Sequence, residues 1–64
     1  MLRLYGVKYL VEKELSAKYG LSVNWFRKAR YDGKSPKYHK LNGKVYYTEE
    51  NVDRWFKDNL KTVQ

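Results

Sequence analysis

Residues 20–33 of this 64-residue chain read GLSVNWFRKARYDG, which predicts the end of one helix, a short turn and the whole of a second helix. Gly20 is placed to end a helix, because glycine enters the left-handed backbone region without a steric cost. Ser22 is the expected N-cap of a second helix, where its hydroxyl can accept a backbone N–H two or three residues on. This helix is predicted from about residue 23 to residue 31 and ends near Asp32–Gly33. Two helices joined by such a short turn predict a helix-turn-helix.

A first helix is predicted over residues 10–19. Its apolar face has fourfold spacing and consists of Val11, Leu15 and Tyr19. Glu14 and Lys18 are expected to form an i,i+4 ion pair on the outer face. The helix is therefore short and amphipathic, with one side free to pack on the second helix.

The second predicted helix has a packing face and a presented face. The packing face consists of Trp25, Phe26 and Ala29, with Trp25 as a core anchor rather than a base-stacking residue. The presented face consists of Asn24, Arg27, Lys28 and Tyr31. Arg suits guanine edges or phosphates, Asn suits adenine, and Lys and Tyr suit phosphates. Arg30 lies between the two faces, where a phosphate contact is expected. The alternative for the presented face is a solvated surface.

Residues 38–47 predict a β-hairpin, because Asn42–Gly43 tolerates the positive φ angles of a type I′ turn. The two-residue turn pairs Leu41 with Lys44, Lys40 with Val45, His39 with Tyr46, and Tyr38 with Tyr47. Lys40 and Lys44 then lie near the tip on opposite faces, where they can contact phosphates. Alternatively, the lysines only protect an exposed strand edge from pairing.

Thr48 is the expected N-cap of a third helix, with Glu49 and Glu50 in its first turn. The predicted apolar stripe consists of Val52, Trp55, Phe56, Leu60 and Val63. Surface pairs are expected between Glu50 and Arg54 and between Asp53 and Lys57. The whole chain is thus predicted to be one α+β domain with a core from about residue 7 to residue 61. It is a small winged helix-turn-helix, with three short helices and a two-stranded hairpin between the second and third.

Positive charge is concentrated in the middle of the chain. The net charge of +7 divides into +2 over residues 1–22, +6 over residues 23–44 and −1 over residues 45–64. A compact block of cations is typical of a protein that neutralises phosphates. A solubilising face is the other interpretation of the charge alone.

Catalytic and metal-binding residue sets are missing from the sequence. The chain has no Cys, and its single His, at position 39, has no evident catalytic partner. We therefore expect no enzymatic activity, no cofactor and no small-molecule substrate. No apolar stretch approaches the length of a membrane span, so we expect a cytoplasmic protein that does not bind membranes.

The order and spacing of these elements resemble the small phage excisionases and AlpA-type regulators, which have a MerR-like winged helix-turn-helix. The resemblance covers roughly residues 9–57. It rests on Tyr9-Leu10, Lys13-Glu14-Leu15, Gly20-Leu21-Ser22, Trp25 to Arg30, Gly33, Pro36, Tyr38, Lys40, Val45, Tyr47, Val52 and Trp55. Family members usually have Thr where Val11 stands, and many have Arg where Val23 stands. A Val at position 23 can contact a thymine methyl group.

The resemblance implies that the second helix lies in the major groove and that the hairpin is a wing on the neighbouring minor groove or backbone. The candidate recognition-helix residues are Ser22, Val23, Asn24, Arg27, Lys28, Arg30 and Tyr31. The candidate wing residues are Lys37, Lys40, Asn42, Gly43 and Lys44.

The expected function is sequence-specific binding of double-stranded DNA. The expected role is that of an excisionase-like recombination directionality factor or a small transcriptional regulator of a phage or mobile element. An integrase, RNA polymerase or further copies of the chain are the expected partners on DNA, because one small domain covers little duplex. The alternative is a basic module that binds an acidic protein. RNA binding is a third option, which the core-like spacing of the aromatic residues disfavours.

Overall fold

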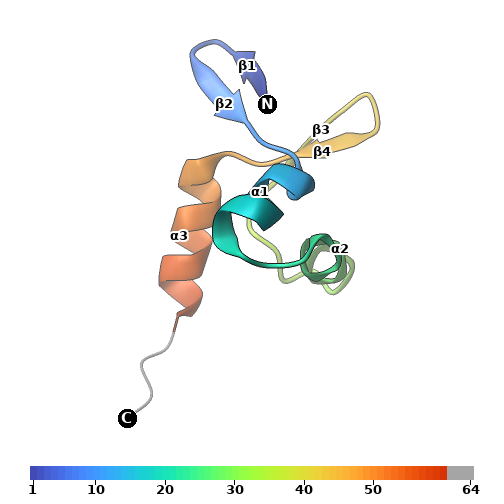
Figure 1. Cartoon of the computed structure of the whole chain (residues 1–64), viewed down its shortest axis with the longest axis vertical. Coiled ribbons are helices and arrows are strands. Elements are labelled where there is room, and N and C mark those ends of the chain that lie inside the picture. The colour runs from blue at the N-terminus through green and yellow to red at the C-terminus, as the bar shows by residue number, and fades with distance from the viewer. Residues whose placement is uncertain (61–64) are drawn as a thin grey trace.

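The computed structural model describes residues 1–60, over which a β-hairpin, two helices, a second β-hairpin and a further helix follow one another (Figure 1). The elements are β1 (Leu2–Leu4), β2 (Val7–Tyr9), α1 (Glu12–Tyr19), α2 (Val23–Tyr31), β3 (His39–Leu41), β4 (Lys44–Tyr46) and α3 (Glu49–Asn59). This arrangement confirms the predicted class, a small α+β fold with a hairpin between the second and third helices. Among the described residues, no helix is long and apolar enough to cross a membrane.

The first hairpin, β1–β2, was not predicted from the sequence. Its strands pair antiparallel, with Leu2 opposite Tyr9 and Leu4 opposite Val7. Both turn residues have positive φ angles, 54° at Tyr5 and 75° at Gly6. A Tyr rarely adopts this conformation, so Tyr-Gly is a weaker turn signal than Asn-Gly. The strands are also three residues long and mostly exposed, which leaves little apolar pattern to detect.

Helix α1 begins two residues later than predicted. Leu10 is extended and exchanges two backbone hydrogen bonds with Tyr47, so it cannot belong to the helix. Val11 is the N-cap, and its N–H donates to Glu14 Oε1 at 3.1 Å. Gly20 ends the helix with φ 72°, as predicted.

The predicted ion pair between Glu14 and Lys18 is wrong. Glu14 lies 3.1 Å from the N-terminal amine and also caps the start of α1. Lys18 lies 2.6 Å from Glu49 at the start of α3. Partners brought close by tertiary packing thus replace the local pair, which is worth only about 0.2–0.5 kcal/mol on an isolated helix.

Helix α2 has the predicted bounds. Ser22 Oγ accepts the N–H of Trp25 at 3.0 Å and caps the helix start. Phe26 is buried and Trp25 is partly buried, whereas the residues predicted to be presented are all exposed. The division of α2 into a packing face and an exposed face is therefore confirmed, with Lys28 at the border between them, beside Trp25 and Trp55.

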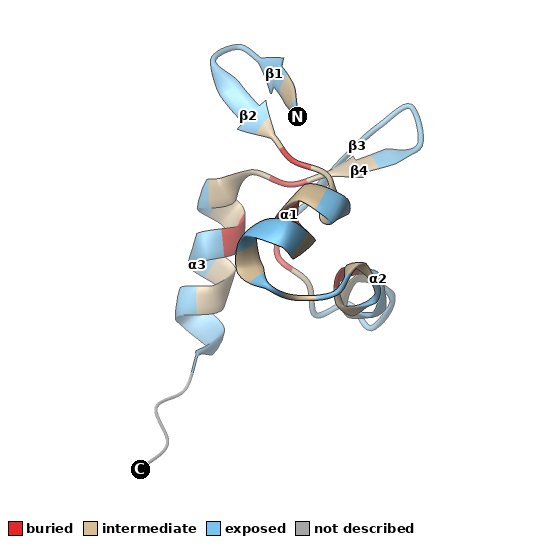
Figure 2. Ribbon diagram, in the orientation of Figure 1, coloured by how far each residue is buried: buried red, intermediate tan, exposed pale blue. Residues whose placement is uncertain are grey.

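The core lies where the three helices meet the bases of the two hairpins, as the buried segments in Figure 2 show. Its buried side chains are Leu10, Leu15, Phe26, Tyr47 and Val52. Trp25 packs against this cluster, with its ring centroid 5.0 Å from Phe26, 5.6 Å from Trp55 and 5.9 Å from Phe56. Trp25 is thus a core anchor, as predicted, and it fastens α2 to α3.

Helix α3 has its predicted cap, since Thr48 Oγ1 accepts the N–H of Asn51 at 3.2 Å. The pair between Glu50 and Arg54 is confirmed at 3.1 Å. Asp53 does not pair with Lys57 as predicted, because it accepts the hydroxyl hydrogen of Tyr19 at 2.6 Å.

The predicted apolar stripe of α3 is correct for its first three members and wrong for Leu60. That residue is the C-cap of α3, just beyond the helix end, and is 81% exposed, so it does not belong to the packed face. The predicted stripe residue Val63 and the predicted core boundary at residue 61 lie outside the described residues.

Candidate nucleic-acid interface

The β3–β4 hairpin forms the predicted wing. His39 pairs with Tyr46, Lys40 with Val45, and Leu41 with Lys44. The turn residues Asn42 and Gly43 have φ angles of 51° and 78°, which a type I′ turn requires. The register prediction is therefore confirmed for the three pairs within the strands. Tyr47, which was expected to pair with Tyr38, instead forms a backbone bridge with Leu10.

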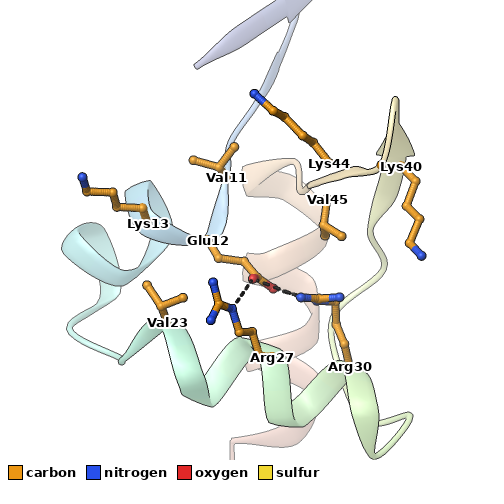
Figure 3. Close-up of a pocket in the computed structure, with 10 residues that line it drawn as sticks. Val11, Glu12, Lys13, Val23, Arg27, Arg30, Lys40, Lys44 and Val45 are labelled. Carbon is orange, nitrogen blue, oxygen red and sulfur yellow. Dashed lines mark hydrogen bonds and ion pairs between the residues drawn. The ribbon is translucent and has the colours of Figure 1, made fainter.

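A groove separates the wing from α2, with the start of α1 at its floor (Figure 3). Its lining residues are Val11, Glu12, Lys13, Val23, Arg27, Arg30, Lys40, Gly43, Lys44 and Val45. The groove thus combines five cationic side chains with one carboxylate. Helices α1 and α2 and both strands of the wing supply the cations, so their proximity depends on the tertiary fold.

Lys40 and Lys44 leave the wing in different directions, as Figure 3 shows and as the strand register requires. Both are exposed, and within the described part of the chain neither forms an ion pair. Their charges are therefore available to an anionic partner on both sides of the wing.

Glu12 is the centre of a polar cluster on the groove floor. Arg30 donates from Nε to Glu12 Oε2 at 2.7 Å and from Nη2 to Oε1 at 3.2 Å. The Tyr47 hydroxyl donates to the same Oε2 at 2.9 Å. The Glu12 side chain is 11% exposed and that of Arg30 is 24% exposed. Because Arg30 meets the carboxylate with two nitrogens, its charge is largely neutralised inside the protein.

Two pKa shifts follow from this cluster. The hydrogen bonds to Glu12 raise the pKa of Arg30. Burial, followed by the hydrogen bond to Glu12, raises the pKa of Tyr47. Arg30 therefore stays cationic and Tyr47 stays a hydrogen-bond donor throughout the physiological pH range.

Arg27 differs from Arg30 in its exposure. Its side chain is 67% exposed, and its Nε lies 4.0 Å from Glu12 Oε1. That distance is an ion pair but is too long for a hydrogen bond. The guanidinium of Arg27 consequently keeps its donors free for a ligand.

The groove brings together only part of the predicted site. It collects Val23, Arg27 and Arg30 from α2 with Lys40, Gly43 and Lys44 from the wing. Asn24 and Tyr31 are exposed on α2 but lie outside the groove lining, and Asn42 forms the turn. Ser22 is exposed, but its hydroxyl already caps the helix.

Two predicted lysines border other depressions. Lys28 lies beside Trp25 and Trp55, on the side of α2 that faces α3. Lys37 lies beside Pro36 and Tyr38, in the loop before β3. Both are exposed, but neither lines the groove.

Sequence reasoning missed Val11, Glu12, Lys13 and Val45 as groove residues. Lys13 stands in the first turn of α1, and its exposed charge could have been added to the basic set. Glu12 gave no local signal, because its partners Arg30 and Tyr47 are 18 and 35 residues away along the chain.

The remaining charge is distributed unevenly. Figure 1 shows α2 and the wing on one side of α1, and α3 on the other. Helix α3 carries four acidic residues, Glu49, Glu50, Asp53 and Asp58. The fold therefore separates a basic side, with the groove, from a side with most of the acidic groups.

No protein-family model, no curated protein and no solved structure matches this chain. The resemblance to excisionases and AlpA-type regulators therefore stays a prediction, and functional conclusions rest on the groove and the charges around it.

Proposed function

We propose that the protein binds double-stranded DNA, with α2 in the major groove and the β3–β4 wing on the adjoining backbone or minor groove. The observation that carries this proposal is that Arg27 of α2 and Lys40 and Lys44 of the wing line one groove. A duplex approaching that face would meet cations from both elements at once.

The dimensions of α2 support this proposal. With its side chains, an α-helix such as α2 is about 10–12 Å in diameter. The major groove of B-DNA is about 12 Å wide and admits one α-helix. The exposed face of α2 offers Asn24 and Arg27 for base edges, and Val23 beside them for a thymine methyl group.

Electrostatic attraction would supply most of the affinity. The exposed cations of α2 and the wing region are Arg27, Lys28, Lys37, Lys40 and Lys44. Arg30 is excluded from this set because Glu12 already holds it. Four or five phosphate contacts predict a slope of about −4 for the logarithm of the association constant against the logarithm of the salt concentration.

For the biological role, we propose an excisionase-like recombination directionality factor or a small transcriptional regulator of a phage or mobile element. This part rests on the sequence resemblance. One domain of this size covers little DNA, so we propose that an integrase, RNA polymerase or further copies of the chain bind beside it.

A salt series of fluorescence-anisotropy titrations with a random duplex tests the proposal. We expect the steep slope given above, and we expect Lys44→Ala to reduce its magnitude by about one. Lys57→Ala is the matched control, because it removes an exposed lysine from α3. A slope near zero, or equal effects of the two substitutions, would contradict DNA binding through the groove. Retention of an acidic protein with no affinity for DNA would instead identify a protein-binding module.

A further inference from the structure

We propose that Glu12 is a positioning residue for base recognition: it orients Arg27 so that the two terminal nitrogens of that guanidinium meet a guanine edge. This inference rests on the proposed binding of duplex DNA. It assigns a role to an acidic residue at the centre of a basic groove, where a carboxylate by itself would repel phosphates.

Glu12 is a firm anchor. Both of its oxygens are engaged by Arg30, and Oε2 also accepts the hydroxyl hydrogen of Tyr47. The ring of Tyr47 is fully buried, and its backbone is paired with Leu10. A carboxylate held by three donors from two residues has little freedom to follow a neighbouring side chain. Arg27 therefore has to adjust to Glu12, and not the reverse.

The contact with Glu12 selects one edge of the Arg27 guanidinium. Nε is the atom of Arg27 nearest to the carboxylate, at 4.0 Å from Oε1. In Figure 3 the dashed line to the Glu12 carboxylate leaves the Arg27 guanidinium on its Nε side, so the two terminal nitrogens take no part in that contact. These nitrogens form a planar pair of donors that matches the O6 and N7 acceptors of guanine. The exposed, otherwise flexible side chain is thus preorganised for end-on recognition.

The carboxylate also opposes indiscriminate binding. It is poorly exposed, so solvent and salt screen its charge less than that of a surface acid. Without it, the positive potential of the groove would rise and Arg27 could turn towards a phosphate. Glu12 should therefore lower the affinity for random sequence while raising the preference for one base pair.

The test compares Glu12→Gln with wild type on two kinds of duplex: a site selected by the wild-type protein from a random pool, and versions of it with each base pair replaced in turn. Glu50→Gln is the matched control, because it removes a carboxylate that pairs with an arginine on the exposed face of α3. For Glu12→Gln we expect discrimination at one G·C pair to fall about tenfold. Affinity for random duplex should stay unchanged or increase.

The link to Arg27 is tested by a double-mutant cycle. In an Arg27→Ala background, Glu12→Gln should no longer change discrimination at that base pair. Arg27→Lys keeps the charge but loses the paired donors, so it should lose the same discrimination while the salt slope stays constant.

If Glu12→Gln fails to fold, a second variant still tests the positioning role of Glu12. The charge-neutral replacement Glu12→Gln/Arg30→Met removes both members of the ion pair, which is often tolerated better than removal of one. It should show the same loss of discrimination as Glu12→Gln. Circular dichroism of each variant checks that the helices are intact.

The outcomes separate this inference from the proposed function. If wild type shows no salt-dependent binding and no selected site, DNA binding itself is wrong. If wild type selects a site but Glu12→Gln keeps full discrimination, or weakens all sequences equally, then Glu12 only supports the fold and the positioning role is overturned.

Discussion

Leu10 and Tyr47 exchange two backbone hydrogen bonds, with N···O distances of 2.7 and 2.8 Å. This bridge fastens the base of the wing to the residue that precedes α1. The Tyr47 side chain then reaches Glu12, which holds Arg30 of α2. One residue therefore links the wing to both helices of the helix-turn-helix, and the groove between them depends on that link.

The first prediction concerns the hydroxyl of Tyr47. Tyr47→Phe keeps the buried ring but removes one donor from a poorly exposed carboxylate. We expect the free energy of unfolding to fall by about 1–2 kcal/mol, measured by urea denaturation. Tyr46→Phe is the control, because within residues 1–60 the Tyr46 hydroxyl forms no hydrogen bond. Equal stability of the two variants would show that the contact with Glu12 contributes nothing.

The second prediction concerns the N-cap of α2. Ser22→Ala removes the acceptor of the Trp25 N–H and should lower the free energy of unfolding by about 1 kcal/mol. In a domain of this size that corresponds to a decrease in Tm of about 4–8 °C. Ser22→Asp restores a capping oxygen and should recover most of the loss. If Ser22→Ala has the same Tm as wild type, the cap does not stabilise α2.

Much of the fold follows from local signals in the sequence. Gly20, Ser22, Thr48 and the Asn42–Gly43 turn each act on their own few neighbours, so the bounds of α2, the caps and the wing register could be predicted. The separation of α2 into two faces also follows from its periodicity.

What the sequence does not predict depends on contacts between distant residues. The start of α1 is set by the Leu10–Tyr47 bridge, and the pairing of Lys18 is set by the position of α3. Arg30 has the residue type of a phosphate ligand, yet a carboxylate 18 residues earlier holds it. The sequence therefore predicts which elements carry the candidate site, but not which of their side chains remain free to bind a ligand.

The third prediction compares the two hairpin turns. Gly43 and Gly6 have φ angles of 78° and 75°, and nothing lies within 4 Å of an added Cβ at either position. Gly43→Ala and Gly6→Ala should therefore both cost about 1–2 kcal/mol through backbone strain alone. Only Gly43→Ala distorts the wing, so only it should weaken DNA binding in the anisotropy titration. A similar loss of affinity in both variants would contradict the assignment of β3–β4 as the wing.

The fourth prediction concerns pH. The N–H of Val11 is the main cause that lowers the pKa of Glu14 below its ordinary value; burial opposes it, and the N-terminal amine lowers the pKa further. A lowered folded-state pKa means that Glu14 stabilises the fold above its unfolded pKa, about 4.3, and loses this contribution as the pH falls through the folded pKa. Glu14→Gln should therefore be less stable than wild type at pH 7, and the difference should shrink below about pH 4. Urea midpoints across this range measure it, and a difference independent of pH would contradict the account.

The most direct measurement of the central claim is an NMR titration of the labelled protein with a random DNA duplex. The amide resonances of α2 and of the β3–β4 wing should shift together as DNA is added, while those of α3 from Val52 to Asn59 should stay nearly constant. Shifts concentrated on α3, or shifts of α2 without the wing, would contradict a duplex bound across the groove between them.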